Sequence, residues 1–538
     1  MRIGDSSANI KHDVDALIAS ESREASMNFF TYLVLGVAAS GGMTFGLDIG
    51  TAAITSMDYF RSEMDIPLLG TADADSTATS NKITLFTVLF HVFTMIGAPF
   101  AGAISDRIGR RAVIVIACTL FTAGAIWQSA SRHYLDVILG RCLGGIGNGF
   151  VLTVIPIYAA ELAPERIRGK TLVIFNFSIT FGIFFMGVFN ELVKSEEWGW
   201  RVAIGLQGIP CIVILITTLL VFPESPRYLV KKHKDEQARA ALEKLCRGNE
   251  NADQIVDYQL KRIQFEIAEA ERIGVGSFQE LFNDFPTLLC GLMVPFCQNV
   301  TGANWFLNYG TILFNSLGYE AFAMDLVLKT LNMVGTACTF FFIERAGRKF
   351  LTLWGAVCTV TIFLIVAVVI VATGTDLTMK NGDPTTHSVQ LFTLICIFLF
   401  QYIYGLTWGP PAWAVPSEVF SLRTRGKGMA LAVGANMATN ICFGDYGYLA
   451  LSTATNIQIT LFILVAANVI FVLTTTLFFQ PETRQLSLEE MRKIFAYKPY
   501  GGKEGDEKGS MTQFFRRNAA QAMQILRFKP ANPRSEPF

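Results

Sequence analysis

The sequence predicts an all-α membrane protein of twelve transmembrane helices, arranged as two six-helix halves with a polar helical linker between them. Three observations support this fold class. The 538 residues are 51% hydrophobic and include 44 Phe, and the mean hydropathy is +0.41, which is too apolar for a soluble protein of this length. Twelve apolar segments are long enough to cross a bilayer. Short charged motifs also recur once in each half of the chain.

The apolar segments each span about 20 residues or more, the length that crosses the hydrocarbon core. One long polar interval separates six segments from the other six. The predicted division is an N-terminal segment 1–28, a first half 29–222, a linker 223–285, a second half 286–480 and a tail 481–538. The predicted spans are 29–49, 83–104, 112–131, 136–160, 170–193, 201–222, 286–316, 322–343, 351–373, 389–416, 428–450 and 456–479.

Basic residues gather in alternate short loops and set the predicted orientation. The loops between are nearly free of Lys and Arg, so the positive-inside rule places the basic loops and both termini in the cytosol. The N-terminus lacks the basic-then-apolar pattern of a cleaved signal peptide, and we expect a multi-pass protein of the plasma membrane. The basic loops carry DRIGRR (106–111), ERIRGK (165–170), ERAGRK (344–349) and RTRGK (423–427).

The polar segments outside the spans differ in character. Within the linker, DEQARAALEKLCR (235–247) has the apolar spacing of a helix. The tail from residue 482 onward is polar and somewhat basic, and we expect it to be solvated, with no core of its own and a weak attraction to anionic lipid.

Composition also excludes several classes of function. Lys plus Arg and Asp plus Glu both number 44, so net charge indicates no nucleic-acid partner. The ten cysteines are scattered singly, mostly in apolar segments, which indicates small buried side chains and neither a disulfide framework nor a metal site. No nucleotide-binding loop or nucleophile motif is present, so we expect no enzyme, no cofactor and no metal. The oligomeric state is not indicated.

Two of the charged residues inside predicted spans stand out. Asp48 is at the end of the first span, and Arg141 opens GRCLGGIGNGF in the fourth. A charged side chain in the hydrocarbon costs about 2.5 to 3.5 kcal/mol on insertion scales, so each residue requires a partner or a function. An Asp–Arg pair that breaks when the Asp takes a proton would supply both, and the two residues therefore favour a proton-coupled secondary transporter. A static buried pair is the alternative.

Paired motifs indicate that the two halves are copies of one unit, as in transporters that rock one half against the other around a central site. On these motifs the chain resembles the sugar porters of the major facilitator superfamily, over roughly residues 25–495. The motif pairs are DRIGRR (106–111) with ERAGRK (344–349), Glu161 and Arg168-Gly169 with Glu418 and Arg425-Gly426, and PESPR (223–227) with PETR (481–484).

The resemblance implies charged networks that link the halves at the cytosolic side and must break when the inner gate opens. The alternative is that these residues only anchor loops at the membrane surface. The implied residues are Asp106, Arg107, Arg110, Arg111, Glu161 and Arg168 in the first half, and Glu344, Arg345, Arg348, Glu418 and Arg425 in the second.

The seventh span carries a polar sequence, CQNVTGANWFLNYG (297–310), which is similar to a sugar-binding element of that family. The likeness places Gln298, Asn299 and Asn304 at the sugar. Amides suit a sugar because each offers donors and acceptors to hydroxyl groups. A regular helix would turn Asn304 away from Gln298, so a bend near Gly302 is expected.

Further positions match the family's polar contacts and gates. Trp413 would stack on a pyranose, Tyr309 matches an outer-gate aromatic residue, and the Gly409-Pro410 step would let span ten bend. For a single amide in a span, a hydrogen bond between helices is the alternative. The other implied sugar contacts are Asn176, Asn332 and Asn436.

The resemblance also bears on coupling. Asp48 and Arg141 match the acid and the base of proton-coupled members, and Glu161 is expected to act in coupling or in the gate. The implied activity is symport of a monosaccharide, a hexose first, with protons into the cell, so that the partners are a sugar, a proton and the lipid bilayer.

Departures from the family keep other substrates and mechanisms open. Asn stands at 176 and 299 where Gln is usual, and Lys329 could bind an acidic sugar such as galacturonate unless Asp325, four residues earlier, neutralises it. Asp445 is an unexplained acid that could pair with Lys329. A sugar uniporter and a sugar sensor are further alternatives. His91 reads as a packed polar residue more readily than as a proton relay.

Overall fold

The computed structural model describes residues 29–68, 77–162, 165–246, 252–273, 278–374, 384–420, 424–447, 457–483 and 511–526. Every regular element in these ranges is a helix. Within these described ranges, ten helices are long and apolar enough to span a membrane. The seventh and eleventh predicted spans are also helical but are made of shorter pieces.

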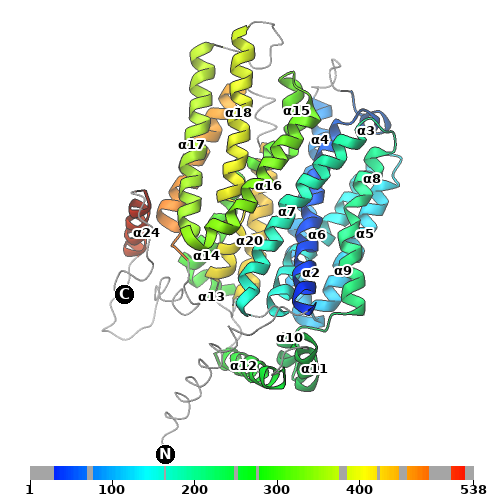
Figure 1. The fold of residues 1–538 in the computed structure, drawn as a ribbon, viewed down its shortest axis with the longest axis vertical. Coiled ribbons are helices and arrows are strands. Elements are labelled where there is room, and N and C mark those ends of the chain that lie inside the picture. Colours follow the sequence, from blue (N-terminus) through cyan, green and yellow to red (C-terminus); the bar gives the residue numbers. More distant parts are fainter. Residues whose placement is uncertain are drawn as a thin grey trace, which may run out of the picture.

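The first half forms one side of the bundle in Figure 1, drawn from blue to green. Its sixth span is two helices that meet at Gln207. Its helices are α2 (Phe29–Thr51), α4 (Thr77–Ile108), α5 (Arg110–Ser129), α6 (Tyr134–Leu162), α7 (Glu165–Val193), α8 (Gly199–Leu206) and α9 (Gly208–Leu220), with the short η1 (Ala52–Ser56) and α3 (Asp58–Glu63) after α2.

Small residues let these helices approach closely. A Cβ atom on Gly147 of α6 would lie 2.5 Å from the backbone N of Phe121 in α5, and one on Gly149 would lie 2.4 Å from the carbonyl oxygen of Thr94 in α4. The glycines of GRCLGGIGNGF therefore pack α6 between α4 and α5, the usual role of small residues between membrane helices.

The second half lies beside the first (Figure 1). Its seventh span breaks at Gly302, whose φ of 88° lies in the left-handed region that favours glycine, so the expected bend is present. Its tenth span breaks before Pro411. The elements are α14 (Phe285–Val300), α15 (Ala303–Ser316), α16 (Ala321–Ala346), α17 (Arg348–Thr373), α18 (Pro384–Thr407), α19 (Pro411–Val419), α20 (Arg425–Thr439), the π-helix η2 (Asn440–Gly447), α22 (Ile457–Ala467), η3 (Asn468–Leu473) and η4 (Thr475–Phe479).

The linker is helical where it is described, as expected. In Figure 1 its helices α10 to α12 lie at one end of the first half. The elements are α10 (Pro226–Lys231), α11 (Asp235–Cys246), α12 (Ala252–Ile273) and α13 (Phe278–Asn283). The boundaries at 222, 285 and 480 remain predictions.

The expectation of a solvated tail without packing is wrong for residues 511–526. They form α24 (Met511–Leu526), whose Ala522 and Ile525 are buried with Leu353 of α17. The Nζ atom of Lys349, also buried, donates a hydrogen bond of 2.6 Å to the carbonyl oxygen of Asn518. The rest of the tail after Thr483 lies outside the described residues.

Candidate functional site

The first buried ion pair lies inside the first half. The Nη1 atom of Arg141 in α6 is 2.8 Å from Oδ1 of Asp48 in α2, and the two side chains are 1% and 2% exposed. Arg141 also donates from Nε to the carbonyl oxygen of Phe86, at 2.7 Å. Its guanidinium lies 4.0 Å from the centre of the Phe86 ring and 4.8 Å from that of Phe90. A buried charge pair is tolerated when its remaining hydrogen-bonding groups are satisfied, and these contacts meet that condition for Arg141.

A second buried pair joins the two halves. His91 of α4 lies with Nδ1 2.7 Å from Oδ2 of Asp445, which comes from η2 in the second half. The other carboxylate oxygen of Asp445 accepts a hydrogen bond of 2.8 Å from Asn308 of α15. Asp445 therefore pairs with His91, and the suggested pairing of Asp445 with Lys329 is wrong.

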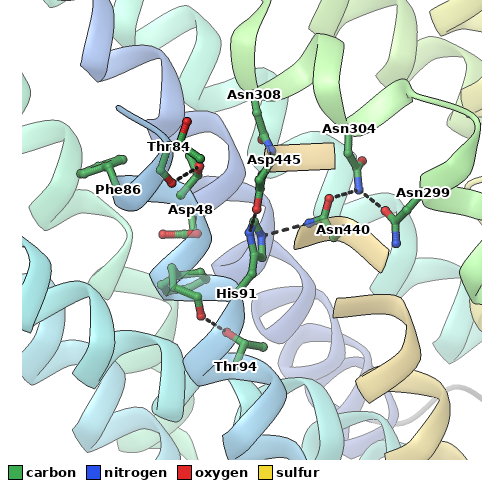
Figure 2. A network of polar contacts seen from close by, with 12 residues as sticks. Asp48, Thr84, Phe86, His91, Thr94, Asn299, Asn304, Asn308, Asn440 and Asp445 are labelled. Carbon is green, nitrogen blue, oxygen red and sulfur yellow. Dashed lines mark hydrogen bonds and ion pairs between the residues drawn. The ribbon is translucent and has the colours of Figure 1, made fainter. Parts of the chain in front are cut away.

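A chain of hydrogen-bonded amide side chains leads from His91 to the seventh span. Figure 2 shows the connection from His91 through Asn440 to Asn304 and Asn299. The Nδ2 atom of Asn440 is 3.1 Å from Nε2 of His91. Asn304 donates from Nδ2 to Oδ1 of Asn440 at 3.1 Å and to Oδ1 of Asn299 at 2.5 Å. Asn440 thus connects the His91–Asp445 pair to Asn304 and, through Asn304, to Asn299, two of the predicted sugar contacts.

The remaining amides of the seventh span meet the eleventh and tenth spans. Asn436 donates from Nδ2 to Oε1 of Gln298 at 2.9 Å, and Asn299 donates to the carbonyl oxygen of Asn436 at 2.7 Å. Gln298 donates to the carbonyl oxygen of Gly409 at 3.4 Å. The Nδ2 atom of Asn176, from α7 in the first half, lies 3.6 Å from the position that a Cβ atom on Gly409 would take. Predicted contacts from both halves therefore converge near Gly409.

Two of these side chains have buried polar atoms without a hydrogen-bond partner. They are Nδ2 of Asn176 and both amide atoms of Asn332 in α16. A buried polar group costs free energy unless it is paired, so these atoms are candidates for sugar hydroxyl groups. Trp413, the predicted stacking residue, is half-buried in α19 at the edge of the second-half core.

Contacts between the halves close one end of the bundle, the end opposite the basic loops. The hydroxyl of Tyr309 is 2.9 Å from Oγ1 of Thr87, and Oγ of Ser56 is 2.8 Å from Oγ1 of Thr311. Each contact joins the first half to α15 in the second half. Tyr309, predicted as a gate residue, is thus placed at a contact that must break when this end opens.

A third contact at this end is partly exposed. Nζ of Lys194, after α7, is 2.5 Å from Oε1 of Glu320, before α16. Partial burial acts to raise the pKa of Glu320, but the hydrogen bonds from Lys194 and from the backbone N–H of Ala323 outweigh it, and the pKa lies below its ordinary value. Glu320 therefore remains charged and paired at neutral pH.

The charged motifs of the first half form an ion-pair cluster at the other end. Arg110 contacts Glu161 at 3.2 Å and Asp106 at 3.3 Å. Arg111 donates from Nη2 to the carbonyl oxygen of Leu219. The carbonyl oxygen of Arg107 accepts a hydrogen bond from the hydroxyl of Tyr228.

The second half repeats this arrangement. The Nη2 atom of Arg348 is 2.9 Å from Oε1 of Glu418. These described ion pairs join helices of one half, whereas we expected networks that link the halves. Arg345 is exposed, and the side chains of Arg168, Glu344 and Arg425 lie outside the described part of the chain.

Glu224 and Glu482 explain why the PES and PET motifs recur. Oε1 of Glu224 accepts the backbone N–H of Arg110 at 2.9 Å, and Oε1 of Glu482 accepts that of Arg348 at 3.0 Å. Each carboxylate thus satisfies N–H groups at the start of a helix, where negative charge is stabilising. The repeat was visible in the sequence, but these two acids were not included in the predicted networks.

Glu161 lies with Arg110 and not with the Asp48–Arg141 pair. Twenty residues of α6 separate Glu161 from Arg141, which at 1.5 Å per residue is roughly 30 Å. The structure therefore places Glu161 in the charged cluster at the basic loops.

Lys329 is already paired. Its Nζ atom lies 2.6 Å from Oδ2 of Asp325, and the two side chains are 0% and 3% exposed. The ammonium group does not reach the surface and is not alone in a cavity. The structure therefore favours the alternative in which Asp325 neutralises the charge of Lys329.

The comparisons with known proteins agree with this geometry. The family model described as "Sugar (and other) transporter" matches residues 34–495. The chain belongs to this sugar transporter family. It is therefore a multi-pass membrane transporter and not an enzyme. Among its relatives is the H(+)/hexose cotransporter 2 of Parachlorella kessleri, 29% identical over 90% of each chain. Another is the sugar carrier protein C of Ricinus communis, 30% identical over 87% of this chain and 90% of the relative.

Solved structures confirm the fold. The structure of XylE, described as a proton:xylose symporter of the major facilitator superfamily, covers 87% of this chain and 100% of its own with a TM-score of 0.69 and 23% identity. A partially occluded inward-open form of XylE from E. coli matches with a TM-score of 0.66, also at 23% identity. The predicted twelve-helix transporter fold is confirmed.

Proposed function

We propose that this transporter carries a monosaccharide, a hexose first, together with protons, by alternating access between two halves. The observation that carries the proposal is the Asp48–Arg141 pair, buried and 2.8 Å long. Protonation of Asp48 removes the negative charge that holds Arg141, so α2 and α6 are free to move relative to each other. The names of two similar proteins, an H(+)/hexose cotransporter and a proton:xylose symporter, support coupling to protons.

The substrate is a neutral sugar. The predicted sugar contacts that converge near Gly409 are amides, which pair with hydroxyl groups through both donors and acceptors. Lys329, the one residue that suggested an acidic sugar, is matched by Asp325 at 2.6 Å. Galacturonate is thus the weaker candidate, because an anion would have to displace that carboxylate.

The cycle follows from the contacts at the two ends. The protein lies in the plasma membrane with both termini cytosolic, so the end closed by Tyr309 and Thr87 faces outward. Opening of that end admits sugar while Asp48 takes up a proton from outside. Release of the proton to the cytosol lets Asp48 pair with Arg141 again, in the state described here, and sugar leaves inward.

The test replaces the acid. Asp48→Asn cannot titrate, so sugar accumulation against a gradient falls to the equilibrium level while exchange of labelled for unlabelled sugar continues. Asp58→Asn, at an exposed acid of α3, is the matched control and keeps accumulation. Concentrative uptake by Asp48→Asn would overturn the assignment of Asp48. Wild-type protein that equilibrates sugar without concentrating it would be a uniporter.

A further inference from the structure

The His91–Asp445 pair is separate from the Asp48–Arg141 pair, but the two pairs lie close together. The rings of Phe45 and Phe90 meet the imidazole edge-on, with centroids 6.4 and 5.9 Å away. The same Phe90 ring lies under the guanidinium of Arg141. The charged groups that act on His91 are Asp445, Asp48 and Arg141. These four ionisable residues form one buried cluster that spans both halves.

The orientation of the neighbouring amides favours one protonation state of His91 in this arrangement. Oδ1 of Asn440 accepts from Asn304, so Nδ2 of Asn440 faces His91 and donates to Nε2. Because Nε2 accepts, the proton of a neutral imidazole is on Nδ1, where it is donated to Asp445. His91 is therefore neutral when the chain of amides has the arrangement described here.

The buried cluster of Asp48, Arg141, His91 and Asp445 then carries a net negative charge. With His91 neutral, two carboxylates, Asp48 and Asp445, face one guanidinium, Arg141. An excess negative charge in a buried site is costly, and one added proton would remove it. Nε2 of His91 is the one imidazole position left to receive that proton.

Protonation at Nε2 would change the sugar site. The new N–H would face the NH₂ group of Asn440, and the amide must turn to present Oδ1 to it. Asn304, which now donates both of its N–H groups, to Asn440 and to Asn299, would then face a donor. It must release Asn440, and the N–H group set free becomes available to a sugar hydroxyl group.

We propose that His91 is a second proton-binding residue of this transporter, and that Asn440 transmits its protonation to Asn304 and Asn299 at the sugar. The proposal rests on the proposed proton-coupled function and extends it to a second titratable site. It couples proton uptake to tighter sugar binding, which is the sign that symport requires. Because His91 and Asp445 come from different halves, opening of the outer end also breaks their contact.

The test measures sugar affinity as a function of pH. Purified full-length protein in liposomes is assayed for exchange of radiolabelled D-glucose, or of D-xylose if glucose is not carried, from pH 5 to 8. Each proton bound together with the sugar changes the affinity by about tenfold per pH unit where it titrates. His91→Gln, which keeps a neutral amide near the Nε2 position, should lose one proton's share of this dependence.

Two further variants make the result specific. Asn440→Ala leaves His91 able to titrate but removes the connection to Asn304, so it should flatten the same dependence. Thr94→Ser, one turn from His91 on α4 and hydrogen-bonded to the Phe90 and Gly145 carbonyls instead, should match wild type. The double variant Asp48→Asn with His91→Gln should have no pH dependence left.

The outcomes separate the two proposals. If wild type shows pH-dependent affinity and both His91→Gln and Asn440→Ala retain it in full, the role of His91 is wrong and proton-coupled transport stands. If wild-type affinity and uptake are independent of pH, the proposed function itself fails, and the inference fails with it. Should His91→Gln not assemble, the Asn440→Ala profile alone decides, since Asn440 carries no charge.

Discussion

Asn440 lies in a crowded position between His91 and Asn304, and its amide contacts both side chains. It lies at the start of the π-helix η2, a rare conformation that is frequent at functional sites. Its amide fits only because residue 444 has no side chain: a Cβ atom there would lie 2.2 Å from Oδ1 of Asn440 and 3.3 Å from Cβ of Asn304. Gly444 therefore leaves room for the contact between His91 and the amides that we propose bind sugar.

Gly444→Ala should displace the Asn440 amide and weaken sugar binding about tenfold, since a clash of this size costs roughly 1–3 kcal/mol. The measurement is the half-saturating sugar concentration in exchange. Gly434→Ala is the matched control, because a Cβ at Gly434 of α20 meets nothing within 4 Å. Equal effects of the two substitutions would contradict the role given to Gly444.

The Asp48–Arg141 pair could be predicted from the sequence, whereas the His91–Asp445 pair could not. Asp48 and Arg141 were predicted because a charge inside an apolar span is rare and demands a partner. His91 and Asp445 lie 354 residues apart, and their contact depends on which helices of the two halves meet and on the turn of η2. Asp445 stood out as an acid within a span, but nothing in the linear sequence selects His91 over Lys329 as its partner.

Helix α24 is the element that the sequence analysis missed. Its apolar residues do follow helical spacing, yet a short amphipathic segment does not reveal its docking site. The site is the start of α17, where Lys349 has no exposed surface and donates to the Asn518 carbonyl oxygen. The helix thus covers a buried lysine as well as Leu353.

Truncation before Met511 should lower the thermal stability of the purified transporter. It exposes Leu353 and leaves Lys349 without the Asn518 carbonyl oxygen, a loss of roughly 1–3 kcal/mol. Truncation after Leu526, which keeps α24 (Met511–Leu526), is the control. Identical melting temperatures for the two truncations would show that the helix contributes nothing to stability.

Across the whole molecule, the repeated motifs and the twelve spans sufficed to predict two similar halves, because hydropathy and basic loops are local properties of a membrane sequence. The conformation could not be predicted, because alternating access uses the same helices in several arrangements. In the arrangement described here, Ser56 and Thr311 close the end opposite the basic loops.

A disulfide between the variants Ser56→Cys and Thr311→Cys should hold that end closed. The two hydroxyl oxygens are 2.8 Å apart, so the paired thiols are within reach of each other. Oxidation should abolish uptake, and a reducing agent should restore it. Each single variant, treated in the same way, controls for the ten native cysteines. Full uptake by the cross-linked protein would mean that this end need not open.

The proposed function requires that sugar and protons enter the cell together. The direct measurement is external pH in an unbuffered suspension of cells that lack their own sugar carriers and express this chain, on addition of hexoses, pentoses and galacturonate in turn. We expect alkalinisation with a neutral sugar. Entry of radiolabelled sugar without any pH change, or a pH response confined to galacturonate, would contradict it.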